Sequence, residues 1–309
     1  MKAYHIYIIG ISLCIASCTR HSQEWEELQD VETYIVTNAD SALMTLQNIQ
    51  PESLINKEEK AKHALLLSMA MDKNYIDRTD FEVLQPAIDY YSEKGTPEEK
   101  LRTYYYQGRI YQNKGDNDLS MKAFINAREL KDEITDTLTY ANLLVAQGTY
   151  LYSSYKIEEF IDNNLQAARL YQAIERSYYQ MTSLASALDG SIINKDKQLA
   201  DSIMTLCKSN IKEHPNYGSI MTPYVISYII AFGSDEEIRN TVDSVYPYNR
   251  LSNDAILNIA SGLYQIGEND KALQVLDSIQ SETLNTKSLK YLSIKANVLE
   301  ENGKYEDAL

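Results

Sequence analysis

Five side chains between residues 102 and 113 have types and spacing suited to holding a carboxylate. They are Arg102, Tyr105, Arg109, Gln112 and Asn113. The first four are separated by three, four and three positions, so on a helix they share one stripe, with Asn113 beside it. Arginine binds a carboxylate through two parallel hydrogen bonds. We therefore expect the stripe to bind a carboxylate; alternatively, both arginines pair with acids of the chain itself, such as Glu98 or Glu99.

No other pattern in the chain predicts catalysis or metal binding. The four histidines are widely separated, and no H-E-x-x-H, C-x-x-C, G-x-S-x-G, Walker or dinucleotide-binding glycine motif occurs. Paired carboxylates such as Glu58 and Glu59 are typical of solvated helix faces in an acidic protein. We expect no catalytic residue, no metal and no cofactor.

The stripe belongs to a spaced frame of small and large residues that recurs along the chain. The clearest copy consists of Tyr104, Gly108, Tyr111, Gly115, Phe124 and Ala127. Two further copies near the end include Ala260, Gly267 and Ala272, and Ala296, Gly303 and Ala308. In each copy a small residue on a first helix is followed twelve positions later by another on a second helix, which lets two backbones approach closely. The glycine between them suits a turn with positive φ.

This frame resembles the tetratricopeptide repeat, a helix-turn-helix unit of 34 residues. The resemblance implies an all-α fold, a right-handed α-solenoid of helical hairpins over residues 24–309. The clearest repeats are 101–134, 253–286 and 289–309, the last incomplete, and about seven hairpins are expected in all. It also implies that the stripe lines the concave surface, where some family members clamp a peptide's terminal carboxylate.

Tyrosine is unusually frequent, with 25 tyrosines against 4 phenylalanines and one tryptophan. Most are expected at seams between helices, where the ring is buried and the hydroxyl stays wet. In the tetratricopeptide frame, Tyr105, Tyr106 and Tyr152 face the concave side or its rim. We expect these three to contact a ligand; the alternative is that they are ordinary surface aromatics.

The first eighteen residues predict a lipid anchor. Residues 1–17 carry Lys2 and a short apolar run, typical of a signal peptide and too short to span a bilayer. The run ends in Ile15-Ala16-Ser17-Cys18, which matches the bacterial lipobox and makes Cys18 the lipidation site. Cys14 is the rival acceptor, but bulky Leu13 precedes it. Residues 18–23 then form a tether, and Cys207 remains as a core thiol.

Together these features predict an interaction scaffold that is lipid-anchored in the bacterial cell envelope, faces the periplasm and binds a protein or peptide. The net charge of −15 argues against nucleic acid as a partner. Two alternatives remain. In the first, the repeats form the sensory half of a transmembrane regulator that continues beyond Leu309. In the second, the chain is a glycan-capturing lipoprotein of the SusD type, although it lacks that family's tryptophan-rich loops.

Overall fold

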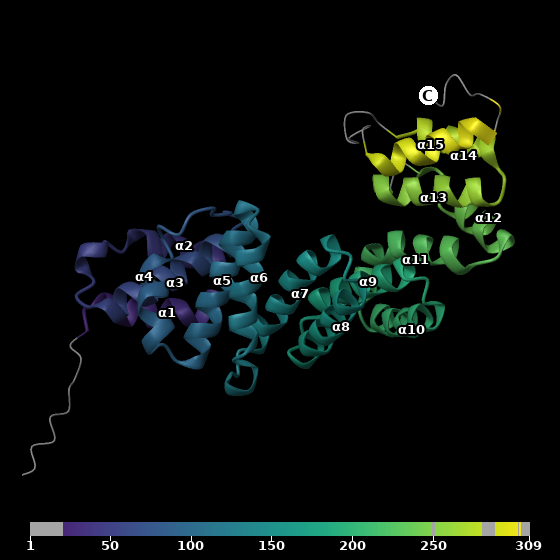
Figure 1. Ribbon diagram of the computed structural model, residues 1–309. Helices are drawn as coiled ribbons and strands as arrows, with labels where there is room; N and C mark the ends of the chain where they lie inside the picture. Colours follow the sequence, from purple (N-terminus) through teal and green to yellow (C-terminus); the bar gives the residue numbers. More distant parts are fainter. Residues whose placement is uncertain (1–20, 249–250, 280–287, 302, 304–309) are drawn as a thin grey trace, which may run out of the picture. The chain divides into compact units, whose positions relative to one another are not determined.

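The computed structural model describes residues 21–248, 251–279, 288–301 and 303. Over these residues the chain forms fifteen α-helices and three short 3-10 helices, without a β-strand (Figure 1). Consecutive helices pack as antiparallel hairpins, so the predicted fold class, an all-α solenoid of helical hairpins, is confirmed. None of the helices in these residues combines the length and the apolar character that crossing a bilayer requires. The predicted lipidation site Cys18 lies outside the described residues.

The chain divides into two compact units, which meet in the sequence between Thr96 and Pro97. The first contains two hairpins, formed by α1 (Glu24–Tyr34) with α2 (Ala39–Asn48) and by α3 (Lys57–Lys73) with α4 (Gln85–Lys94), and the 3-10 helix η1 (Pro51–Ser53). Its core is built from aliphatic side chains of all four helices or their ends, among them Leu28, Leu46, Leu66 and Leu84, each at most 1% exposed.

A buried carboxylate attaches the start of the described chain to α3. Glu59 is fully buried and accepts hydrogen bonds from the backbone N–H groups of Ser22 at 2.7 Å and Ile55 at 2.8 Å. The side chain of Asn56 donates a further bond at 3.1 Å. Burial alone raises the pKa of Glu59, but the hydrogen bonds from Ser22, Ile55 and His21 outweigh it and leave the pKa below its usual value. Ser22, four positions after Cys18, is therefore held against the helical unit.

The second unit continues the series of hairpins. The first helices of its hairpins are α5 (Pro97–Lys114), α7 (Thr137–Ser153), α9 (Ser177–Ile193), α11 (Gly218–Phe232) and α13 (Asn253–Gln265). The second helices are α6 (Asn117–Arg128), α8 (Ile157–Ala173), α10 (Lys197–Glu213), α12 (Asp235–Ser244) and α14 (Asn269–Asp277). Then α15 (Leu289–Glu301) packs on α13 and α14, and the 3-10 helices are η2 (Lys131–Glu133) and η3 (Pro215–Tyr217). With the two hairpins of the first unit, the described chain has the expected seven.

The clearest repeat packs as its small residues predict. The Ser120 hydroxyl of α6 donates to the backbone carbonyl of Gly108 on α5 at 2.9 Å, so the two backbones are close. The Phe124 ring covers the bare Cα of Gly108, and a Cβ atom there would lie only 2.3 Å from the ring. Glycine at this position is therefore required by packing. The corresponding position in the last repeat, Ala308, lies outside the described residues.

The turn between the two helices of a hairpin uses left-handed backbone. Gly115, Gly267 and Gly303 have φ of +83°, +77° and +71°, which confirms the turn predicted from the glycines. The turn after Gly115 closes with hydrogen bonds from the amides of residues 115 and 116 to the carbonyls of 112 and 111. The same bonds and a positive φ occur at non-glycine residues between other helices, namely Tyr75, Tyr155, Glu175 and Lys195. The degenerate repeats therefore keep the turn without its preferred residue.

Cys207 is a core residue, as predicted. Its side chain on α10 is fully buried and forms no disulfide. Burial raises the pKa of its thiol to about 12, so the reactive thiolate is scarce at neutral pH. Cys207 packs in a cluster with Ile203 and Met204 of the same helix and Leu188 of α9.

Candidate binding surfaces

The predicted carboxylate-binding stripe lies along α5, and most of its polar groups have partners within the chain. The Arg102 guanidinium pairs with the Asp136 carboxylate, with 2.6 Å between Nε and Oδ2. Arg109 donates to the side-chain oxygen of Gln112 at 2.6 Å, and Gln112 donates in turn to the backbone carbonyl of Ala146 at 3.3 Å. These bonds connect α5 to the start and the middle of α7.

Asp136 is a structural carboxylate with two tasks. It caps α7 by accepting from the backbone N–H of Thr139 at 3.0 Å, and it neutralises Arg102. Burial alone raises its pKa, but the Arg102 charge and the Thr139 hydrogen bonds outweigh this effect and hold the pKa below its usual value. A ligand carboxylate at Arg102 would have to displace a partly buried, already ionised partner.

Arg102 also has an acidic partner beyond its own helix. It pairs with Asp136 of the next hairpin, 34 positions away. Glu98 accepts from the backbone N–H and the hydroxyl of Thr135, at 3.0 and 3.1 Å, and these bonds together with the nearby charge of Arg102 lower its pKa. Repeat-to-repeat contacts of this kind are not visible in the local sequence. Whether Arg102 and Arg109 contact a ligand stays a prediction.

Tyr105 and Tyr106 are buried, which corrects the expectation that both face an accessible surface. Only 6% and 5% of their surfaces are exposed. Tyr105 packs against Phe124 of α6 with ring centroids 6.2 Å apart, and against Tyr106 edge-on at 4.9 Å. Because α5 contacts both α6 and α7, residues on either side of the helix are covered. Gln112 and Asn113, near the end of the helix, are half-buried.

Tyr152 is exposed, as predicted, and belongs to a larger group of aromatic and acidic side chains. Its side chain on α7 is 43% exposed, and its ring meets Phe160 of α8 edge-on with centroids 5.1 Å apart. The Asp189 carboxylate of α9 lies close to the Tyr152 hydroxyl. Partial burial and this carboxylate both raise the pKa of Tyr152. The phenol therefore stays protonated at neutral pH.

The group extends across two more hairpins. Tyr224 of α11 is half-buried, and its pKa is raised by burial and by the nearby carboxylates of Asp189 and of Asp254 on α13. Tyr152, Asp189, Tyr224 and Asp254, which we call the Tyr–Asp row, thus come from four successive first helices. Of these helices, α9 contacts α11 and α11 contacts α13. The row presents phenol rings beside carboxylates along one layer of the unit.

Sequence reasoning identified only one member of this row. Asp189, Tyr224 and Asp254 occupy different positions in their hairpins, so no fixed frame offset connects them to Tyr152. Their proximity follows from the way each hairpin is displaced relative to the next. A weak signal was available: each lies on a predicted first helix and is polar or aromatic.

The remaining described residues do not suggest a metal centre. Within these residues, no three His, Cys, Asp or Glu side chains lie close enough together to hold a metal ion. Comparison with protein-family models and with curated proteins finds no match for this chain.

Proposed function

We propose that this chain is a tetratricopeptide-type interaction scaffold that a lipid on Cys18 holds at the periplasmic face of a bacterial membrane. The observation that carries the binding role is the Tyr–Asp row on α7, α9, α11 and α13. Aromatic side chains are frequent in protein interfaces because they bury a large area and lose little conformational freedom. Arranged along a stack of helices, they form an elongated surface suited to a peptide or a partner's helix.

The chemistry of the row favours a basic partner segment. Asp189 and Asp254 place carboxylates beside two tyrosine rings. A lysine or arginine of a partner can form an ion pair with a carboxylate while its charged group lies over a neighbouring tyrosine ring. The net charge of −15 adds long-range attraction for a cationic partner. An acidic partner would be repelled by the same charges.

The lipid anchor is supported by the lipobox and by the position of the helical unit. Ser22 is hydrogen-bonded to buried Glu59, so only the few residues between it and Cys18 separate the first unit from the proposed lipid. The scaffold would then bind its partner close to the bilayer surface. Labelling with a fatty acid tests this assignment: Cys14→Ala should still be lipidated, and Cys18→Ala should not. A labelled Cys18→Ala protein would contradict it.

The binding role is tested with a fluorescent arginine-rich peptide and a glutamate-rich peptide of equal length. We expect the basic peptide to bind with an affinity that falls as salt rises, since the attraction is electrostatic. Replacing Tyr152 and Tyr224 together by alanine should weaken binding by about tenfold or more. The matched control is Tyr178→Ala on α9, because Tyr178 is also exposed, at 49%, but is not part of the row. Equal losses in the two variants would contradict the proposal.

A further inference from the structure

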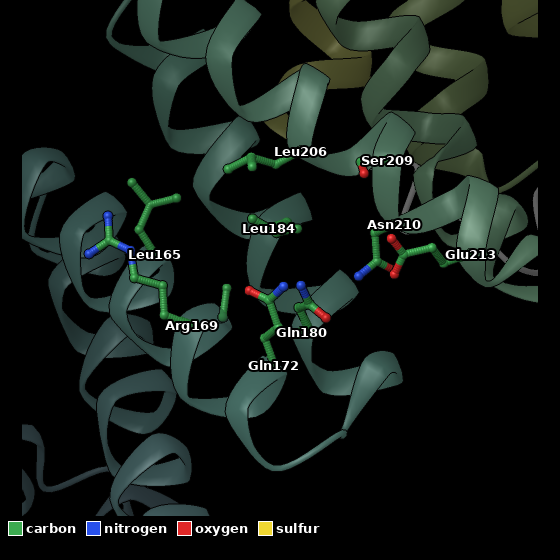
Figure 2. Close-up of a pocket in the computed structure, with 10 residues that line it drawn as sticks. Leu165, Arg169, Gln172, Gln180, Leu184, Leu206, Ser209, Asn210 and Glu213 are labelled. Atoms are coloured by element: carbon green, nitrogen blue, oxygen red, sulfur yellow. The ribbon is translucent and has the colours of Figure 1, made fainter.

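A second surface of the same unit holds a pocket formed by α8, α9 and α10. It has a volume of about 290 Å³ and lies where α9 packs against both neighbouring second helices. Leu165 of α8, Leu184 of α9 and Leu206 of α10 supply its apolar lining (Figure 2). Both the pocket and the Tyr–Asp row include residues of α9, but they have no residue in common.

The pocket contains a buried amide that lacks a partner within the described chain. Asn210 of α10 is only 6% exposed, and its side-chain oxygen is both inaccessible to water and without a hydrogen-bond partner. Buried polar atoms in proteins are almost always satisfied, so an exception calls for an explanation. Figure 2 shows the amide groups of Asn210, Gln172 and Gln180 directed toward the middle of the pocket. A ligand with both hydrogen-bond donors and acceptors can pair with the two glutamine amides, and a small shift of the Asn210 side chain would bring its enclosed oxygen to the same ligand.

Opposite charges flank these amides. Arg169 of α8 lies on one side of the pocket and Glu213 of α10 on the other (Figure 2). Neither forms a salt bridge with another side chain in the described part of the protein, so both are available to a ligand. A molecule lying across the pocket thus meets a cation, carboxamides over leucine side chains, and then an anion.

We propose that this pocket binds an extended peptide segment with an apolar residue between an acidic and a basic one. The main-chain amide of such a segment offers both a donor and an acceptor to Asn210 and the glutamines. Its acidic side chain would pair with Arg169, its basic side chain with Glu213, and its apolar side chain would contact the leucines. A sugar fits less well, because no aromatic ring lines the pocket for it to stack on. This inference rests on the proposed peptide-binding function but assigns a separate site with different ligand chemistry.

The test uses two capped tripeptides, acetyl-Asp-Leu-Lys-amide and acetyl-Lys-Leu-Asp-amide, with acetyl-Ser-Leu-Ser-amide as the neutral control. Titration calorimetry on the purified protein should show one charged peptide binding about tenfold or more tightly than the neutral one, since two charge-assisted bonds are added. Asn210→Leu should weaken that binding about tenfold or more without lowering the melting temperature, because the amide has no partner to lose inside the protein.

Three results would overturn the proposal. They are equal affinity for charged and neutral peptides, unchanged affinity in Asn210→Leu, and Asn210-dependent binding of a maltooligosaccharide in place of the peptides. Arg169→Gln and Glu213→Gln should each abolish the preference for charged peptides. The variant with Tyr152 and Tyr224 replaced by alanine should bind the tripeptide as the wild type does. If the tripeptide binds but the arginine-rich peptide does not, the proposed role of the Tyr–Asp row fails and the pocket proposal stands. If the arginine-rich peptide binds but the tripeptides do not, the pocket proposal fails and the role of the row stands.

Discussion

Replacing Gly108 by alanine should destabilise the α5–α6 hairpin, because the added methyl group has no space. A Cβ atom at Gly108 would lie 2.3 Å from Cε1 and 2.4 Å from Cδ1 of Phe124. Carbon atoms in contact are normally about 3.5–4.0 Å apart. Phe124 is itself only 1% exposed, so its ring has little room to turn away.

The expected magnitude follows from two opposing effects. Alanine is favoured over glycine inside a helix by about 1 kcal/mol. Overpacking a well-filled core costs about 1–3 kcal/mol. The overlap with the Phe124 ring is severe, so we place the packing cost at the upper end of this range, which leaves a net loss of about 1–2 kcal/mol.

Gly148→Ala is the matched control, because Gly148 occupies the equivalent position on α7. There the added Cβ would lie 3.2 Å from Nδ2 of Asn164 and 3.4 Å from the Phe160 ring, contacts that a small shift relieves. We expect no net loss of stability for this variant. Phe124→Leu should remove most of the clash at Gly108, so the two substitutions should show a coupling free energy of about 1 kcal/mol or more.

The assay must be local, because a solenoid need not unfold as one cooperative unit. Amide hydrogen exchange of peptides from α5 and α6 reports the opening of this hairpin directly. A loss of 1.4 kcal/mol corresponds to about tenfold faster exchange. Unchanged or slower exchange in Gly108→Ala, with no dependence on Phe124→Leu, would refute the packing that we describe.

Three further predictions concern charge, backbone and thiol chemistry. The folded-state pKa of Asp136 lies below its unfolded value of about 4, so its stabilisation is present above that pH and is lost as pH falls through the folded pKa. The protection of α7 amides, taken as the observed exchange rate relative to the intrinsic rate at the same pH, should therefore fall in acid for the wild type and much less for Asp136→Asn. Tyr155 and Gly115 both have positive φ, which glycine adopts more easily than other residues. By the same exchange assay, Tyr155→Gly should stabilise its turn by up to about 1 kcal/mol, and Gly115→Ala should destabilise the equivalent turn by about 1–2 kcal/mol. Cys207 should react with a water-soluble thiol reagent only at the rate at which α10 opens, and rapidly in denaturant.

The hairpins and their turns could be predicted because their causes are local. Gly108 and Ser120 are twelve positions apart, and that spacing alone places two helices in close contact across a short turn. Cys207 was predicted as a core residue from the same frame. Positive φ at Tyr155 and Lys195 escaped prediction, since nothing about these residue types favours a left-handed backbone.

The binding surfaces were harder to predict because they depend on neighbouring repeats. The burial of Tyr105 depends on packing with Phe124 of the next helix, and the partner of Arg102 comes from the following hairpin. The Asn210 pocket combines residues from three helices between positions 165 and 213. Any short stretch of sequence contains only part of such a site, and helix periodicity describes one helix at a time.

The fourth hairpin shows how the fold is kept while the repeat pattern is lost. Phe160 stands forty positions after Ser120, so a large ring occupies the site of a small residue, while Asn164 replaces the ring of Phe124 one helical turn later. Glycines accommodate the shifted ring: an added Cβ would lie 3.4 Å from it at Gly148 of α7 and 3.0 Å at Gly190 of α9. Both hairpins place one aromatic ring and smaller residues between their helices, so the space is filled whichever of the two positions carries the ring. A position-by-position comparison with the repeat pattern therefore counts two mismatches, although the total side-chain volume between the helices is kept.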